Sequence, residues 1–255
     1  MRIFLGFFGL TRSLRHTIGS ISTQIFEPLA QSGTEAPRYG HFHLPRAIFN
    51  ARSGEYGLAT DPTEPALLGL QHCQVDAQDP ALIADTLKIA QSQPDRYGDH
   101  YASVRNLCFQ LRSLNCLWSM LEPALTEQDW VAFLRPDLRY LDRLDLPRMV
   151  DGLARAGADL AVPAWQSWGG LNDRFAVANA RGARAYATRV SRLEAASTMT
   201  AGVHAETLLG FTAVTERLRV ARLSTRAIRI RANGHAARND LLCFGLQSSP
   251  QSAAA

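Results

Sequence analysis

The sequence predicts an α/β fold in one domain. Short apolar runs alternate along the chain with amphipathic stretches, and the 255 residues, 46% of them apolar and 20% charged, suffice for a large core. Disorder as the main state of the chain is thereby excluded. We assign residues 1–240 to the domain and residues 241–255 to a partly disordered C-terminal tail, because residues 248–255 are of low complexity.

The first part of the chain predicts a strand, a helix and a long irregular segment. The apolar run 3–10 favours a buried strand over a signal peptide, because only Arg2 precedes it and no A-x-A-like cleavage site follows. Residues 14–29 are amphipathic and predict a helix. Glycine and proline recur over residues 31–65, which predicts mostly loop around short extended pieces such as 47–49.

The longest predicted helix covers residues 101–122. Leu107, Leu111, Leu114, Trp118 and Leu121 recur there at helical spacing, and Pro123 ends the pattern. Around it we expect a helix over 80–90, strands over 130–134, 159–163 and 175–178, helices over 146–156, 180–189 and 205–217, and short strands over 220–223 and 227–230. The strand 130–134 ends at Arg135-Pro136 because proline cannot donate a ladder hydrogen bond.

Arginine dominates the basic residues. Lys and Arg number 27 against 23 Asp and Glu, which gives a net charge of +4, and Lys88 is the single lysine. This skew fits bidentate recognition of anions, or an arginine-rich genome. No nucleic-acid recognition pattern accompanies it, so we expect no nucleic-acid partner. The four cysteines form no C-x-x-C pair, which excludes a structural zinc or a disulfide scaffold and predicts a reducing, cytoplasmic location.

Three polar clusters follow predicted strands, where open α/β sheets bind their ligands. They are Thr11-Arg-Ser13, Arg135-Pro-Asp-Leu-Arg139 and Trp165-Gln-Ser-Trp-Gly-Gly-Leu-Asn-Asp-Arg174. The chain lacks a P-loop, a G-x-G-x-x-G motif and a G-x-S-x-G motif, so neither a Walker-type NTPase nor a Rossmann oxidoreductase is supported. No apolar run reaches the roughly 18 residues of a membrane-spanning helix, and we expect no transmembrane segment.

Three segments together resemble the bacterial nucleotide-sugar glycosyltransferases of the GT-A type. They are Gly9-Leu-Thr-Arg12, Asp129-Trp-Val-Ala-Phe-Leu-Arg-Pro-Asp-Leu-Arg-Tyr140 and the stretch from Val162 to Ala178, and the resemblance spans roughly residues 2–234. It implies an α/β/α sandwich with a mixed, mostly parallel central sheet. It also implies sugar transfer from a nucleotide-sugar donor, such as a UDP-sugar, to a glycan or lipid-linked acceptor in bacterial surface polysaccharide synthesis.

The resemblance implies a divalent metal, Mn²⁺ or Mg²⁺, on the diphosphate of the donor. Arg135-Pro-Asp137 stands in place of the family's D-x-D motif and supplies one carboxylate, so Asp137 is the candidate ligand, with His204 as a second. Alternatively, arginines alone neutralise the diphosphate. In that case Asp137 forms a turn after Pro136, and His204 stands at the start of a helix without binding a metal. The donor-binding candidates are Arg12, Asn106, Arg135, Asp137 and Arg139. Asp99, Arg105 and Gln110 could line the same pocket.

The segment Trp168-Gly-Gly-Leu-Asn-Asp-Arg174 resembles the W-G-G-(E/N)-D segment of inverting GT-A enzymes, although Leu171 is an extra residue. Tryptophan offers a flat face to a sugar ring, and paired glycines let the backbone approach a ligand. The acceptor-binding candidates are Trp168, Gly169, Gly170 and Asn172. The resemblance makes Asp173 the base that deprotonates the acceptor hydroxyl. The alternative is a tight turn in which Asp173 caps the turn or pairs with Arg174.

Other interpretations stay open. A non-catalytic nucleotide-binding or nucleotidyltransferase-like relative would have the same sheet and a similar site. Arg229 and Arg231 share one face of a predicted strand and could touch phosphate or solvent. Arg12 and Arg15 lie near an apolar start, which allows peripheral contact with the anionic inner membrane that carries lipid-linked acceptors.

Overall fold

The structure is a computed structural model that describes residues 1–50, 54–200 and 202–247. The strands of its main sheet are β1 (Ile3–Gly9), β2 (Arg38–Leu44), β5 (His72–Ala77), β6 (Trp130–Leu134), β8 (Leu160–Pro163), β9 (Phe175–Asn179) and β10 (Val220–Leu223). Two antiparallel pairs lie outside this sheet: β3 (Ala47–Asn50) with β4 (Glu55–Ala59), and β7 (Leu138–Tyr140) with β11 (Ala227–Arg229).

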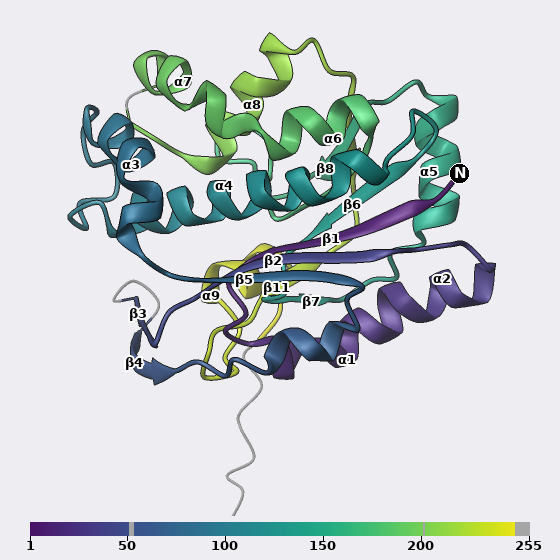
Figure 1. The fold of residues 1–255 in the computed structure, drawn as a ribbon, viewed down its shortest axis with the longest axis horizontal. Coiled ribbons are helices and arrows are strands. Elements are labelled where there is room, and N and C mark those ends of the chain that lie inside the picture. The colour runs from purple at the N-terminus through teal and green to yellow at the C-terminus, as the bar shows by residue number, and fades with distance from the viewer. Residues whose placement is uncertain (51–53, 201, 248–255) are drawn as a thin grey trace, which may run out of the picture.

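The main sheet has seven strands in the order β10-β8-β9-β6-β1-β2-β5. Strand β9 runs antiparallel to both its neighbours, and every other pairing in the sheet is parallel. Helices cover both faces (Figure 1). The predicted α/β class and the mixed, mostly parallel sheet are therefore confirmed.

The described helices are α1 (Leu14–Ile21), α2 (Glu27–Ser32), α3 (Ala84–Gln91), α4 (Ala102–Leu121), α5 (Leu146–Arg155), α6 (Ala180–Ala187), α7 (Leu193–Met199), α8 (Ala205–Thr215) and α9 (Arg238–Cys243). A π-turn over Ser22–Phe26 joins α1 to α2, so the helix predicted over 14–29 is interrupted and continues to Ser32. The helix predicted over 80–90 begins as a 3₁₀ turn over Pro80–Ile83. None of the described helices combines the length and the apolar character that crossing a membrane would require.

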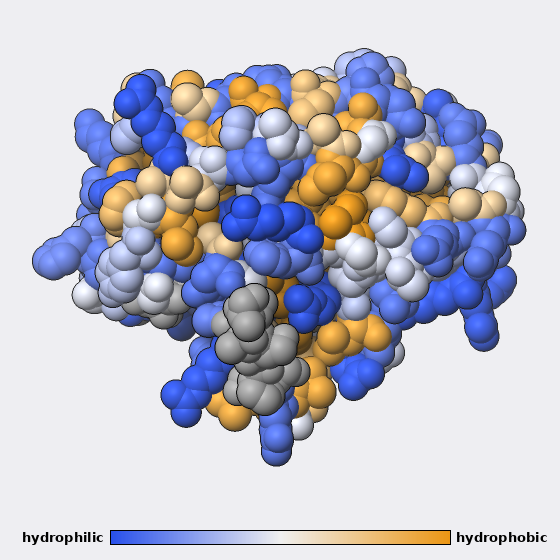
Figure 2. Space-filling view, turned by 90° about the horizontal axis from the view of Figure 1, so that it is seen from below, coloured by the Kyte–Doolittle hydropathy of each residue, from blue (hydrophilic) through white to orange (hydrophobic). Residues whose placement is uncertain are grey.

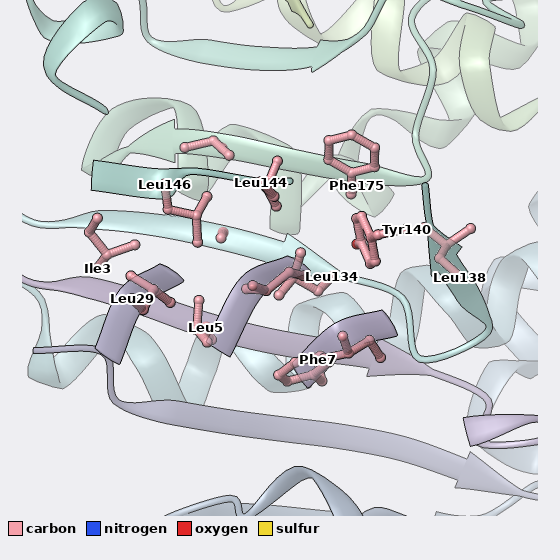
Figure 3. Close-up of a cluster of buried hydrophobic side chains, with 14 of the residues drawn as sticks. Ile3, Leu5, Phe7, Leu29, Leu134, Leu138, Tyr140, Leu144, Leu146 and Phe175 are labelled. Carbon is pink, nitrogen blue, oxygen red and sulfur yellow. The ribbon is translucent and has the colours of Figure 1, made fainter. Parts of the chain in front are cut away.

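Successive side chains of β1 point to opposite faces of the sheet, so this strand contributes to the core on both faces. Ile3, Leu5 and Phe7 are fully buried on the face that carries α1, α2 and α5, where Figure 3 shows them beside Leu134 of β6 and other apolar side chains. Phe4 and Phe8 point to the opposite face, against α4 and α6. The outer surface seen from below in Figure 2 is largely hydrophilic, with apolar residues in small groups.

The prediction of mostly loop over residues 31–65 is wrong for residues 38–44, whereas the short extended piece predicted at 47–49 is confirmed as part of β3. Strand β2 lies inside the sheet between β1 and β5, and β3 and β4 form a hairpin after it. The pattern of β2 was hidden because His41 and His43, which are polar, are both buried. This strand also contains Gly40. A Cβ at this position would lie 2.6 Å from the Leu70 side chain, so a larger residue would force its neighbours to shift. Strand β5 was not predicted because it is an edge strand with mostly exposed side chains.

The C-terminal part differs from the predicted tail as well. Helix α9 crosses the predicted boundary at residue 241, because Asp240 is completely buried and pairs with two arginines of the domain. Strand β11 pairs with β7 instead of joining the main sheet. The disorder predicted for residues 248–255 lies outside the described residues.

Candidate functional site

The candidate site lies at the carboxyl ends of β1 and β6, which are neighbouring parallel strands. The chain leaves β1 toward β2 on one side, whereas β6 lies on the other, so this is a point where the strand order reverses and a crevice forms. A cavity of about 730 Å³ opens there. The predicted site residues that line it are Arg12, Asn106, Arg135, Asp137, Trp168, Asp173 and His204.

Hydrogen bonds join the segments that carry these residues. Gly9 ends β1 with a φ of +101°, a conformation that favours glycine, and its N–H donates to Ser113 Oγ of α4 at 2.8 Å. Ser13 Oγ donates to the Ile230 carbonyl just after β11 at 2.9 Å, and Thr17 Oγ1 donates to the Pro136 carbonyl at 2.6 Å. The turns after β1, β6 and β11 are thus fixed to one another.

Asp137 is buried and holds two arginines. Arg135 donates to it through Nε at 2.9 Å and Nη2 at 2.7 Å, and Arg12 Nη2 donates at 3.2 Å. Burial alone would raise the pKa of Asp137, but the charges of Arg135 and Arg12 hold this pKa well below its usual range. Asp137 is therefore a charged anchor whose two oxygens both accept from guanidinium groups.

Two further buried carboxylates hold arginines of the cavity. Glu55 lies 3.2 Å from Arg12 Nη1 and 4.0 Å from Arg231 Nη1. Asp240 accepts from Arg229 Nε at 3.1 Å and Nη2 at 3.0 Å, and it lies 2.7 Å from Arg174 Nη1. Both carboxylates are fully buried, so they fix the arginines from behind the cavity wall.

Positive charge is in excess around the cavity. Six arginines and three acidic residues are among the described residues that line it. Burial and the charge of Arg229 lower the pKa of Arg174 to about 10. Burial and the charges of Arg12 and Arg229 lower the pKa of Arg231 to about 10 as well. Both shifts have the sign expected where cations are crowded, and such a site favours an anionic ligand.

Asp173 is connected to this group through Gln110. Gln110 Nε2 donates to Asp173 Oδ2 at 2.6 Å, and Gln110 Oε1 accepts from Arg135 Nη1 at 3.2 Å. Arg189, which is fully buried, lies 3.4 Å from the same Oδ2. The ion-pair partner of Asp173 is thus Arg189 and not Arg174. Both contacts fall on Oδ2, and Asp173 Oδ1 has no hydrogen-bond partner in the described part of the chain.

The turn before Asp173 places Trp168 at the cavity. Its side chain is exposed, and its φ of +44° lies in the left-handed region, which costs a non-glycine residue about 1 kcal/mol or more. Gly170 packs on α8, because a Cβ there would lie 1.9 Å from the Glu206 carbonyl oxygen. The turn therefore needs glycine at position 170 in order to approach α8 and carry Trp168.

Three of the predicted acceptor-binding residues do not line the cavity. Gly169 and Gly170 form the turn, and Gly170 faces the backbone of α8. Asn172 is fully buried, where its Nδ2 donates to the Trp165 carbonyl at 2.6 Å and its Oδ1 accepts from the Arg174 N–H at 3.0 Å. Gly170 and Asn172 therefore shape the turn and face away from the cavity.

Arg139 is also not part of the cavity. Its neighbours Leu138 and Tyr140 in β7 point into the core, so the Arg139 side chain lies on the opposite face, where Nη2 donates to the His16 carbonyl at 3.5 Å. Of the helix-start residues, Arg105 and Gln110 line the cavity, whereas Asp99 accepts from the Ser103 N–H at the start of α4.

The expected membrane contact of Arg12 does not fit the structure. Only 9% of its side chain is exposed, and it pairs with Glu55 and Asp137 at the cavity.

Asp137 and His204 do not fit a metal ion as they are placed. Both Asp137 oxygens accept from arginines, whose charges would repel a cation. His204 Nδ1 lies 3.1 Å from Glu206 Oε2. No group of three or more histidine, cysteine, aspartate or glutamate side chains close enough to hold a metal is present in the described residues.

Glu206 is a cavity residue that the sequence did not single out. Burial and the charge of Asp173 raise the pKa of Glu206 to about 7. Glu206 is the second residue of α8 and lies near the turn that carries Trp168, and nothing in its local sequence marks it. The sequence prediction also lacks Arg174, Glu55 and Asp240, because ion pairs between separate segments, such as Arg174–Asp240 and Arg12–Glu55, leave no local pattern.

The raised pKa of Glu206 predicts a pH-dependent stability. As pH rises from about 4.5 to about 7, the unfolded chain releases the Glu206 proton before the folded chain does, so the wild type should lose stability relative to Glu206→Gln. Urea unfolding of both proteins between pH 4 and pH 8 measures this difference. Glu216→Gln, at the exposed end of α8, should show no such trend, and a parallel pH profile for Glu206→Gln and wild type would contradict the prediction.

Comparison with known proteins gives matches among solved structures only. The sequence matches no family model and no curated protein. Mouse xyloside xylosyltransferase 1 is 13% identical, with a TM-score of 0.41 over 87% of this chain and 84% of its own. A glycosyltransferase involved in the glycosylation of the major capsid of PBCV-1 is 12% identical, with a TM-score of 0.43 over 88% and 82%. A197 from STIV is 10% identical, with a TM-score of 0.35 over 92% and 89%. We rest no conclusion on similarities this distant.

Proposed function

We propose that the protein is a glycosyltransferase that moves a sugar from a nucleotide-sugar donor to a glycan or lipid-linked acceptor. The observation that carries the proposal is the composition of the cavity. Arginines suited to a diphosphate, an exposed tryptophan suited to a sugar ring and a carboxylate suited to proton transfer line the same space. The sequence resemblance supports a place in bacterial surface polysaccharide synthesis.

The reaction assigns a role to each of these groups. The acceptor hydroxyl oxygen forms a bond to the anomeric carbon, the bond from that carbon to the diphosphate oxygen breaks, and the hydroxyl proton passes to Asp173 Oδ1. Gln110 and Arg189 hold Oδ2 and orient the carboxylate. Arg12 and Arg135 stabilise the charge that develops on the leaving nucleoside diphosphate. Trp168 stacks on a sugar ring at the cavity.

A second candidate is a nucleotide-binding or nucleotidyltransferase-like protein without sugar transfer. The ion pair between Asp173 and Arg189 favours it, because a carboxylate held by a buried guanidinium group and by Gln110 can serve the fold alone. Such a protein would bind a nucleotide in the same cavity.

Release of nucleoside diphosphate from UDP- and GDP-sugars tests the proposal. The purified protein is assayed with EDTA and with Mn²⁺, and with and without simple glycan acceptors. We expect slow hydrolysis or transfer with at least one donor. Sugar-nucleotide binding without turnover would favour the second candidate. Retention on nucleic acid with no binding of any sugar nucleotide would overturn both.

A further inference from the structure

Five arginines form one group in the cavity wall, which we call the arginine cluster: Arg12, Arg135, Arg174, Arg229 and Arg231. Three carboxylates pair with them, namely Asp137, Glu55 and Asp240, and each is at least 97% buried. Five guanidinium groups against three carboxylates leave a formal excess of two positive charges.

The pairing within the arginine cluster is incomplete. Arg231 Nη1 lies 4.0 Å from Glu55, beyond hydrogen-bond distance. Arg12 Nε is buried and has no acceptor among the residues that the structure describes, which is unfavourable for a buried donor. Burial lowers the pKa of Arg231 most, and the charges of Arg12 and Arg229 lower it further, so these three cations also repel one another. A phosphate oxygen would supply both the missing acceptor and the missing negative charge.

A metal ion is a cation, so the same arginines that would attract a phosphate would repel it. To coordinate Asp137 it would have to displace Arg12 or Arg135 from a carboxylate whose two oxygens already accept three guanidinium hydrogen bonds. The displaced arginine would remain nearby with one counter-ion contact fewer, and its charge would repel the metal ion. The arrangement of charge therefore favours direct contact between arginine and anion.

We propose that the arginine cluster binds the diphosphate of the donor directly, with no metal ion between the protein and the phosphates. This inference rests on the proposed function for the identity of the ligand, and it replaces the metal that the sequence resemblance implies. The carboxylates behind the cluster hold the guanidinium planes in place before the ligand arrives, so little reorganisation is needed on binding.

Isothermal titration calorimetry with inorganic pyrophosphate and with UDP tests this proposal. In EDTA both probes should bind the wild-type protein, and Mn²⁺ should change the Kd of UDP by less than about threefold. Arg231→Gln should weaken both probes by about tenfold or more, since a charge-assisted hydrogen bond is lost. Arg231 suits the test because its carboxylate partner is distant, so its replacement leaves no close ion pair broken.

Arg226→Gln is the matched control. Arg226 precedes β11 by one residue and pairs with Asp142 at an exposed position outside the cavity, so both probes should bind this variant as they bind the wild type. A Kd of UDP for the wild-type protein that is about tenfold or more higher in EDTA than in Mn²⁺ would overturn the proposal. So would a folded protein that binds neither probe, or an Arg231→Gln variant with wild-type affinity.

The same titration separates this proposal from the proposed function. Metal-independent binding that depends on Arg231, together with no cleavage of any sugar nucleotide, would support the arginine cluster and contradict the glycosyltransferase. Sugar transfer that occurs only with Mn²⁺, together with UDP binding that requires Mn²⁺, would support the glycosyltransferase and contradict metal-independent binding by the arginine cluster.

Discussion

Replacing Asp137 by alanine is expected to lower the free energy of unfolding by about 3–5 kcal/mol, because the change leaves two largely buried arginines without their shared counter-ion. Arg135 would lose a bidentate partner, and Arg12 would keep only Glu55. Urea unfolding at pH 7 measures the loss. The effect should appear without any ligand, because the ion pairs belong to the folded protein itself.

Asp142→Ala is the control for this change. Asp142 makes a similar bidentate contact with Arg226, but its side chain is 33% exposed and that of Arg226 is 46% exposed. Exposed pairs contribute about 0–1 kcal/mol, so this variant should remain close to the wild type. Equal losses for Asp137→Ala and Asp142→Ala would show that burial of the Asp137 pairs adds nothing to stability.

Replacing Asp173 by asparagine is expected to reduce the rate of sugar transfer by about 10²–10⁴-fold, the usual effect of losing a general base. Asparagine keeps the shape of the side chain and can still accept from Gln110, but it cannot take the proton of the acceptor hydroxyl. The KM for the donor should change little, because Asp173 is not among the groups proposed to hold the diphosphate. Steady-state kinetics in which donor and acceptor are varied in turn, each with the other saturating, measure both quantities.

Loss of the charge also leaves the buried Arg189 unpaired, so Asp173→Asn could lose activity by losing stability. Asp173→Glu separates the two effects because it keeps a negative charge near Arg189 while moving the carboxylate by one methylene group. If Asp173 is the base, this variant should fold and still lose roughly 10²-fold in rate, since misplacement of about 1 Å has that effect. A folded Asp173→Glu enzyme with the wild-type rate would remove Asp173 from the mechanism.

Much of the sheet and part of the site could be predicted because the relevant patterns are local. An unbroken apolar run predicts β1, Pro136 marks the end of β6, and the residues just beyond these two strands include Arg12 and Asp137. Parallel neighbouring strands bring such residues together at one edge of a sheet. The position of Asp173 in the cavity agrees with the pattern of its own segment, although its role as a base stays a prediction.

The rest of the site depends on contacts that no local pattern carries. Strand β2 alternates buried histidines with other residues, so its hydrophobic pattern is weak. Glu55 belongs to a segment predicted as loop, and Asp240 sits at the edge of a predicted tail. Asn172 was assigned to a ligand because its neighbours resembled a binding segment, yet the buried turn uses both ends of its amide.

The contacts that close the cavity have a consequence for the order of folding. Ser13 bonds to Ile230 across 217 positions of sequence, and Ala232 bonds to Glu55 across 177. Such distant pairings have a high loop-closure cost and form slowly. The turn after β1 is therefore made early, but its Ser13 gains its hydrogen-bond partner only when residue 230 has followed. A nascent chain of this protein spends most of its synthesis without a finished cavity.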